Sequence, residues 1–543
     1  MRFFPVRLLI LLCVFSIPVF SQQQNAGELH GNFQVDAQYY NRDSLIGAPV
    51  VPEKILTNGF MNLWYTRGNF TAGVRYENYL NVMQGFDPRF KGSGIPFRFA
   101  SYNNDNLEVT AGNFYEQFGS GMLLRAYEER GLGYDNVFDG VRTRYNPIKG
   151  VYIKGLIGRQ RAFFALTPGI VRAADLEFNL NELIPGGDSA KTQVIIGGSA
   201  VSRYQADQDP IYNLPENVAA FGARMNVIRG KLNFGGEYGY KINDPEANNR
   251  FIYRPGQALL VSATYSTKGF GVLLAVKRLD NFDFRSDRTA TGIGSNINFL
   301  PALTRQHTYN LPATIYPYAT QPNDEMGFQA EVTYTIKKGS KLGGKYGTQL
   351  TFHVGGVNGI QKDSVANDTL GYSSRFFAVS NEVFFRDYHL EIFHKFNKKL
   401  KATLMMLYFV YNKDVVQGLA GFGTIYAPMA VADVTYKFSD RHSLRLEAQG
   451  LITEQDDGSW AMSLLEYTYS PNWFVAVVDQ FNYGNPAEAR QIHYVTGNVG
   501  YMRNGNRIMM QYGRQRAGIF CVGGVCRNVP ASNGFTISIL SSF

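Results

Sequence analysis

Apolar and polar side chains alternate one by one along much of this chain. From Asn32 to Tyr39 every second residue is apolar, and the residues between them are Asn, Gln and Asp. The same pattern returns in residues 70–77 and 232–240. A period of two places successive side chains on opposite faces of a β-strand, whereas a helix would distribute them around its axis. The pattern therefore predicts many strands with one apolar and one polar face.

The connections between these strands alternate between two classes of length. Short turns, most of them rich in Gly, Asn, Asp, Ser or Pro, are expected at residues 66–69, 103–106, 146–150, 228–231, 267–269, 397–399, 439–442, 470–472 and 503–506. Longer polar segments are expected at residues 41–58, 81–96, 115–138, 243–256, 281–325 and 484–490. Tight turns on one side and extended loops on the other are typical of transmembrane barrels.

These patterns predict an all-β fold, a transmembrane antiparallel outer-membrane β-barrel of about 22–24 strands with short periplasmic turns and long extracellular loops. A soluble β-sandwich or a propeller would also contain many strands. A propeller shows a repeat of about 40–50 residues, and no recurring motif of that kind is present. Strand boundaries are indistinct at residues 162–183 and 375–385.

Both ends of the chain carry signals of export and membrane assembly. Residues 1–21 combine two arginines, the apolar stretch Leu8–Phe20 and a small Ser21, which predicts a cleaved signal peptide and leaves residues 22–543 as a single barrel domain. About 13 apolar residues are too few for a transmembrane helix. The chain ends on Phe543, and a terminal aromatic residue resembles the signal read by the barrel-assembly machinery. We therefore expect the outer membrane of a Gram-negative bacterium.

Composition agrees with a membrane barrel and limits its partners. Aromatic residues make up 14% of the chain, which suits aromatic girdles at two membrane interfaces. The net charge of +9 is spread over the chain without a basic block, so nucleic acid is not an expected partner. The expected partners are outer-membrane lipid and lipopolysaccharide, the barrel-assembly machinery during biogenesis, and other envelope proteins.

Two of the three cysteines lie close together near the C-terminus. Cys521 and Cys526 flank the stretch Val-Gly-Gly-Val, which permits a tight reversal, and the oxidising envelope favours a disulfide between them. A metal site is the alternative, but two thiolates without a nearby His or second cysteine pair are a poor ligand set. Cys13 lies in the apolar stretch of the leader and is expected to leave with it.

The sequence contains no recognisable catalytic or cofactor-binding motif. It has no zinc-protease helix pattern, nucleophile elbow, phosphate loop or EF-hand loop. His389, Glu391 and His394 share one predicted strand, but a period of two puts His394 on the opposite face, which favours wall residues over a metal trio. We expect no cofactor, no metal and no enzymatic activity, although catalytic groups from separate strands would leave no linear motif.

Charged residues that alternate with apolar neighbours are expected to face the lumen. The candidates for a lumen or constriction site are Arg75, Glu77, Arg98, Glu108, Glu116, Arg125, Glu128, Arg142 and Arg144, and similar positions hold Lys154, Arg224, Glu237, Arg445 and Glu447. One interpretation is that these charges hold water and pair across strands to stiffen the wall. The other is that opposed Arg and Glu groups create a transverse field that selects polar or anionic solutes.

Two of the long segments differ from ordinary outer loops. Residues 113–140, NFYEQFGSGMLLRAYEERGLGYDNVFDG, combine several charges with aromatic residues suited to gripping a sugar or a peptide. Residues 299–322, FLPALTRQHTYNLPATIYPYATQP, are too apolar for a freely solvated loop. The first segment is expected either to bind such a ligand or to pack against the barrel's own interior, and the second either to fold inward or to meet another protein.

The stretches GNFYEQFGSGMLLRAYEERGLGYDN, GVRTRY and LPALTRQHTYNLPATIYPYATQP resemble an uncharacterised, porin-like outer-membrane barrel family of Bacteroidota. The resemblance implies a fold and a location, and it carries over no catalytic residue. The leading functional hypothesis is a porin-like or transport-related channel for polar solutes. The alternative is a non-enzymatic subunit or scaffold of an outer-membrane assembly or secretion complex. A TonB-dependent transporter is disfavoured, because strands begin near Gly31 and leave no room for an N-terminal plug.

Overall fold

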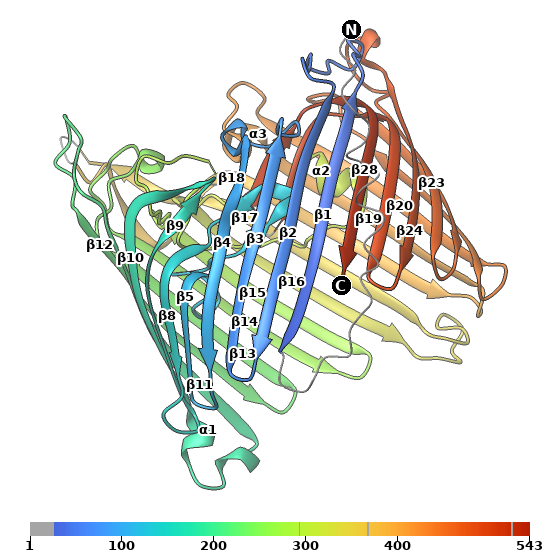
Figure 1. Ribbon diagram of the computed structural model, residues 1–543. Coiled ribbons are helices and arrows are strands. Elements are labelled where there is room, and N and C mark those ends of the chain that lie inside the picture. The colour runs from blue at the N-terminus through green and yellow to red at the C-terminus, as the bar shows by residue number, and fades with distance from the viewer. Residues whose placement is uncertain (1–26, 293, 366–368, 523–524) are drawn as a thin grey trace.

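The computed structural model describes residues 27–292, 294–365, 369–522 and 525–543 (Figure 1). They form one antiparallel sheet of 24 strands, which closes on itself because β1 (Glu28–Tyr40) pairs with both β2 (Ile55–Arg67) and β28 (Ser532–Ser542). Closure leaves no unpaired strand edge, as a sheet surrounded by lipid requires. The predicted all-β, closed antiparallel barrel is confirmed. The predicted signal peptide and its cleavage at Ser21 lie outside the described residues.

The strands follow one another around the barrel in chain order. The first half continues with β3 (Phe70–Leu80), β4 (Gly92–Asn103), β5 (Leu107–Phe114), β8 (Phe138–Tyr145), β9 (Val151–Ala162), β10 (Ala165–Asn179), β11 (Thr192–Tyr204), β12 (Asn217–Arg229), β13 (Leu232–Lys241), β14 (Gly256–Thr267) and β15 (Phe270–Asp280). The second half comprises β16 (Asp324–Ile336), β17 (Thr348–Ser364), β18 (Tyr372–Lys395), β19 (Leu400–Asn412), β20 (Thr424–Lys437), β21 (His442–Leu451), β22 (Trp460–Tyr469), β23 (Trp473–Phe481), β24 (His493–Arg503) and β25 (Asn506–Gln515).

The connections hold two small hairpins and several short helices. The hairpins are β6 (Glu128–Glu129) with β7 (Tyr134–Asp135), and β26 (Gly518–Val522) with β27 (Val525–Val529). The helices are α1 (Leu180–Leu183), α2 (Asn310–Thr314) and α3 (Lys413–Gln417), with 3₁₀ turns η2 (Pro88–Phe90), η3 (Arg130–Leu132), η4 (Gly187–Ser189), η5 (Ala247–Asn249) and η6 (Glu488–Arg490). No helix in the described ranges is both long and apolar enough to cross a membrane.

The predicted alternation of turn lengths is confirmed, with three departures. Every predicted short turn lies on the side of the barrel that also holds both strand termini. Residues 180–191 and 337–347 are longer connections on this short-turn side. On the long-loop side, β9 and β10 are joined by Phe163 and Phe164 alone, and the Phe163 ring packs 4.7 Å from the ring of Phe90. Aromatic contacts thus hold the tip of this short turn.

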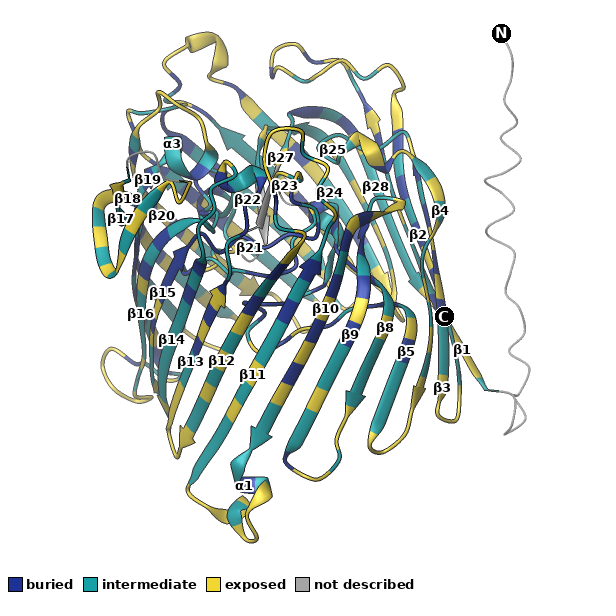
Figure 2. Cartoon of the chain, turned by 90° about the vertical axis from the view of Figure 1, so that its left-hand side faces the viewer, coloured by how far each residue is buried: buried dark blue, intermediate teal, exposed yellow. Residues whose placement is uncertain are grey.

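The outer wall carries the apolar face of the alternating strands. Exposed residues on this face include Val35, Val74, Met225 and Leu446, and the coloured strands in Figure 2 show the change of exposure from one residue to the next. An apolar band on the outside is what a bilayer requires of a barrel wall.

One hairpin covers part of the outer wall on the long-loop side. Arg278 shares the outward face of β15 with Val276, yet it is 1% exposed, because the β17–β18 hairpin lies over it. Arg278 lies 2.9 Å from Asp280, whose carboxylate also accepts a hydrogen bond from the Ser374 hydroxyl at 2.6 Å. Bulges interrupt the pairing of β17 and β18 beyond Val357. The bulges explain why alternation is indistinct at residues 375–385.

Candidate functional site: the lumen

Two long connections fold into the barrel instead of extending from it. We call residues 115–137, between β5 and β8, the first lumen segment, and residues 281–323, between β15 and β16, the second lumen segment. Phe118, Leu123 and Leu124 of the first segment are buried against inward-facing residues of β10–β15, among them Val201. Of the two predicted alternatives, the structure shows packing inside the barrel.

The second lumen segment covers an apolar stretch of the inner wall. Its residues Leu311, Tyr316 and Tyr318 are buried in one cluster with inward-facing residues of β17–β22. The cluster includes Phe409 and Ile425, so the wall is apolar on its inner face as well as on its outer face. Apolar side chains on the inside would meet water in an open pore. The segment is therefore part of the core and not a loose loop.

The two lumen segments are also joined to each other. The Arg125 guanidinium lies over the Phe299 ring at 4.1 Å from its centroid, and the Arg125 backbone N–H donates to the Ile297 carbonyl at 2.9 Å. The Asn136 side-chain amide donates to the Asn296 carbonyl at 2.8 Å. Backbone and side-chain contacts therefore both cross between the two segments.

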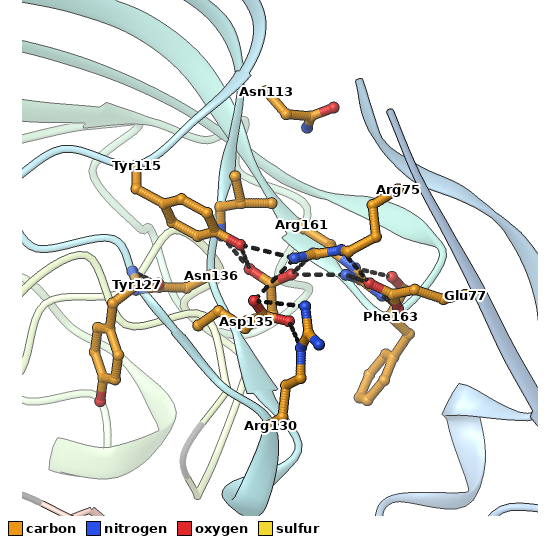
Figure 3. A network of polar contacts seen from close by, with 12 residues as sticks. Arg75, Glu77, Asn113, Tyr115, Tyr127, Arg130, Asp135, Asn136, Arg161 and Phe163 are labelled. Atoms are coloured by element: carbon orange, nitrogen blue, oxygen red, sulfur yellow. Dashed lines mark hydrogen bonds and ion pairs between the residues drawn. The ribbon is translucent and has the colours of Figure 1, made fainter. Parts of the chain in front are cut away.

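A buried ion-pair network fixes the first lumen segment to the wall (Figure 3). We call it the Arg75 network, and it consists of Arg75 and Glu77 on β3, Arg161 on β9, and Glu128, Arg130 and Asp135 of the segment. Arg161 NH1 lies 2.8 Å from Glu77 and 2.7 Å from Asp135, so one guanidinium joins the wall to the segment. Arg75 contacts all three carboxylates.

The charges of the Arg75 network argue against a metal site among its carboxylates. One ligand atom each of Glu77, Glu128 and Asp135 lie within 4.8 Å of one another, a spacing that could hold an ion. Arg75, Arg130 and Arg161 already balance these three negative charges. A divalent ion would add two positive charges beside three guanidinium groups. The Arg75 network is therefore an anchor for the segment.

A second ionic group attaches the start of the first lumen segment to β5, β8 and β9. Glu116 Oε2 accepts from Arg144 Nε at 2.8 Å, and its other oxygen lies 3.4 Å from Lys154 Nζ. Glu108 contacts both Arg142 and Arg144. Burial alone raises the pKa of the Glu116 carboxyl, but the hydrogen bond from Arg144 and the charge of Lys154 lower this pKa below its ordinary value of 4.5.

The predicted lumen residues thus occupy two kinds of position. The strand residues Arg75, Arg142 and Arg144 contact the first lumen segment, which itself carries Glu116, Arg125 and Glu128. Glu77 and Glu108, also on strands, pair with these arginines. Elsewhere Glu237 accepts from the Ser120 backbone N–H at 2.9 Å, Arg224 pairs with Asp175 at 2.6 Å, and Arg445 pairs with Asp433 and Glu447. Most of these charges are paired.

Arg98 does not face the lumen, contrary to the prediction. It lies opposite Val74 in the β3–β4 pairing and shares the outward face with it, and its guanidinium is 3.0 Å from Asp139. The inner face of β4 is taken by Phe97, whose ring stacks on Tyr115 of the first lumen segment at 5.6 Å. The alternation of residues along β4 predicts that its aromatic face meets lipid. In the structure, the first lumen segment buries this face inside the barrel.

The two C-terminal predictions are only partly visible in the structure. The β26–β27 hairpin places Cys521 opposite Cys526 in its register, but both side chains lie outside the described part of the chain, so the disulfide stays a prediction. Phe543 exchanges two backbone hydrogen bonds of 2.9 Å with Gly31 of β1. A side chain at Gly31 would meet the Phe543 ring at 2.5 Å. The role of Phe543 in assembly stays a prediction.

A cavity of about 740 Å³ lies between the lumen segments. Its lining combines aromatic rings and side-chain amides, among them Tyr127, Tyr134, Phe299, Tyr411, Asn248, Asn296, Asn298, Gln321, Asn323 and Gln417. Gly418 and Asn528, which also line it, are exposed residues of connections on the long-loop side. Sequence reasoning missed this cavity, because its lining comes from five connections or strand ends that are far apart in the chain.

Comparison with known protein families identifies the family of this chain. A family model described as a family of unknown function (DUF6029) matches residues 5–543. The chain belongs to this family. No curated protein sequence matches this DUF6029 chain.

Several solved structures share a likeness of fold with this barrel. The P pilus usher (PapC) translocation pore is 8% identical with a TM-score of 0.40, and the match covers 95% of this chain and 99% of that one. A mutant ferric enterobactin receptor (PfeA) from Pseudomonas aeruginosa is 12% identical with a TM-score of 0.43, covering 96% and 82%. The outer membrane protein opdK of the same organism is 10% identical with a TM-score of 0.35, covering 81% and 98%. These are likenesses of fold alone.

Proposed function

We propose that this barrel is an outer-membrane channel that admits a polar, uncharged organic solute by way of the cavity between its lumen segments. The observation that carries the proposal is the cavity itself, which is bounded by both segments and by exposed residues of the long-loop side. A volume of about 740 Å³ lies within the range of about 300–1,000 Å³ that is usual for small-molecule sites. The solute would enter from the long-loop side.

The chemistry of the lining favours a hydroxyl-rich solute over an ion. Asp283 and Arg285, which both line the cavity, are paired at 2.8 Å, and Asp324 is paired with Lys362 at 2.8 Å. The lining therefore has little net charge to attract an ion. Amide groups can donate and accept hydrogen bonds, and aromatic faces can stack on the apolar face of a sugar ring. This supports neutral saccharides as the first class to test.

A liposome-swelling assay tests this proposal with the purified full-length barrel. We expect neutral sugars to enter faster than anionic sugars of equal size. Gln417→Trp places an indole at the cavity wall and is expected to slow sugar entry severalfold, whereas Gln491→Trp, at an exposed loop position that does not line the cavity, leaves entry unchanged. A barrel that admits no sugar and shows no conductance in a planar bilayer contradicts the channel function.

A second candidate function is supported by the β17–β18 hairpin. Phe377 on this hairpin is 78% exposed, and Val379 nearby is also exposed. Contiguous exposed apolar surface marks contacts with another protein or with a membrane, so a subunit of an envelope complex is the second function to test here. A photo-crosslinking residue at position 377 should then give one defined protein adduct in intact cells, and cross-links to lipopolysaccharide alone argue against a protein partner.

A further inference from the structure

Three of the seven histidines of the chain converge at the inner wall. His307 belongs to the second lumen segment, His353 to β17 and His389 to β18, where His353 and His389 are direct partners in the register. The ring centroid of His389 lies 5.6 Å from that of His307 and 6.4 Å from that of His353. Asp387 lies among them, with one carboxylate oxygen 2.8 Å from His307 Nε2 and 3.8 Å from His353 Nε2. We call these four residues the histidine cluster.

The histidine cluster is buried but leaves most of its polar atoms without partners. His353 and His389 are each 1% exposed and Asp387 is 0% exposed. Among the described residues, neither ring nitrogen of His353 or His389 has a hydrogen-bond partner, nor do His307 Nδ1 and one Asp387 oxygen. A buried polar group without a partner costs about 1–3 kcal/mol. Six such atoms in one place indicate a ligand that satisfies several of them together.

The charged groups around the cluster indicate that this ligand is positively charged. The carboxylates of Asp387, Glu331 and Glu391 surround the rings, with Glu331 3.7 Å from His353 and Glu391 3.6 Å from His389. Arg305 is the single cation paired with this group among the described residues, at 2.8 Å from Glu331 and 3.0 Å from Glu391. Unlike the balanced Arg75 network, the cluster thus carries an excess of two negative charges when its imidazoles are neutral.

We propose that the histidine cluster binds one divalent transition-metal ion of the zinc class. Three imidazoles and one carboxylate form a donor set that suits Zn²⁺, and two positive charges match the excess of negative charge. Glu331 and Glu391 are placed to accept hydrogen bonds from the ring nitrogens that do not bind the ion, as carboxylates near metal-bound histidines commonly do.

Binding requires a small movement of the rings. With Zn–N bonds of about 2.0–2.1 Å and tetrahedral angles, the centroids of two bound imidazoles lie about 5 Å apart. The observed separations of 5.6 and 6.4 Å are larger, and ligand atoms from three residues of the cluster do not yet lie within 4.8 Å of one another. The polar contacts of these rings are long, at 3.7 and 3.8 Å for His353 and 3.6 Å for His389, so both rings can turn toward a common ion.

The ion would join the second lumen segment to the wall. His307 is the ligand from the segment, whereas His353, Asp387 and His389 come from two neighbouring strands. The proposal is independent of solute transport, because it concerns how the segment is held and not what passes it.

Cobalt titration of the purified barrel tests the site directly. After treatment with a chelator, the full-length protein in detergent is titrated with Co²⁺ and then with Zn²⁺, and bound metal is counted by elemental analysis. We expect one ion per barrel, visible d–d absorption of four-coordinate Co²⁺, and displacement by Zn²⁺. His389→Gln should weaken binding by more than about 100-fold, since it removes a ligand, while His442→Gln, at the short-turn side, leaves binding unchanged.

A second measurement guards against variants that fail to fold. Unboiled electrophoresis separates the compact barrel from the unfolded chain. If His389→Gln does not run as a compact barrel, His307→Gln replaces it in the titration, because this variant removes the ligand of the segment and leaves the strand ligands unchanged. Wild-type protein that binds no Co²⁺ overturns the proposal without any variant. Equal binding by wild type, His307→Gln and His389→Gln also overturns it, because the ion is then held elsewhere.

Discussion

Replacement of Asp135 by Asn tests whether the Arg75 network holds the first lumen segment against the wall. Asp135 is the segment residue that meets both wall arginines, Arg75 and Arg161, and it also accepts a hydrogen bond from the Tyr115 hydroxyl at 3.0 Å. Asn has nearly the same shape as Asp, so the substitution removes the charge without creating a cavity. The change in stability therefore reports on the ion pairs.

The expected cost follows from the burial of the partners. The side chains of Arg75 and Arg161 are each 3% exposed, so water cannot replace the lost carboxylate. Breaking a buried ion pair by removing one partner costs about 3–5 kcal/mol. Since about 1.4 kcal/mol corresponds to a factor of ten, the released segment should become roughly two to three and a half orders of magnitude more populated.

Limited proteolysis measures this release. Trypsin can cut at Arg125 or Arg130 only when the first lumen segment leaves its buried position, so the rate of cutting reports the population of the released state. Asp188→Asn is the matched control, because Asp188 pairs with Lys149 at 2.6 Å on the exposed short-turn side, where such pairs contribute about 0–1 kcal/mol. If Asp135→Asn and Asp188→Asn are cut at the wild-type rate, the Arg75 network is not the anchor.

Three further predictions concern packing, pH and orientation. Leu311→Ala removes a fully buried side chain of the second lumen segment and should destabilise the barrel by about 2–5 kcal/mol in urea titrations, well above the effect of Leu446→Ala on the outer face. Folding lowers the pKa of Glu116, so its ion pairs stabilise the first lumen segment at pH values above 4.5, the ordinary pKa of this carboxyl. This stabilisation is lost as the pH falls through the lowered pKa. Cleavage of the segment by an acid-active protease should therefore rise on acidification in wild type but not in Glu116→Gln. Arg98→Leu, on the outer wall, should leave single-channel conductance unchanged, whereas Arg144→Leu, beside Glu116, should alter it.

The barrel wall was predictable because its signal is local. Alternation within one strand, such as that of residues 32–39, depends only on which neighbours face lipid and which face inward. Turn chemistry at residues 228–231 or 503–506 is local in the same way. These features establish a large antiparallel barrel, and the strand number of 24 lies at the upper end of the expected range.

The lumen was less predictable because its contacts join distant residues. The period of two correctly separates His394 from His389 and Glu391, but it cannot show that His353 on the preceding strand and His307 of a long connection meet His389. Arg98 shows the opposite difficulty. Alternation finds two faces on β4 but does not say which is inside when a folded segment buries aromatic residues within the barrel.

The Arg75 network and the histidine cluster each hold one lumen segment to the wall, and we expect these contacts to control the width of a path through the lumen. The Arg75 network holds the first lumen segment to β3 and β9, and the histidine cluster lies where the second meets β17 and β18. The cavity lies between the segments, so release of one anchor should widen the path while the other segment stays in place. Asp135→Asn should then raise planar-bilayer conductance without changing Co²⁺ binding, and His307→Gln should abolish Co²⁺ binding without exposing the first segment to trypsin. Loss of both properties in both variants would show instead that the two segments move as one body, through the contacts that Arg125 and Asn136 make with the second segment.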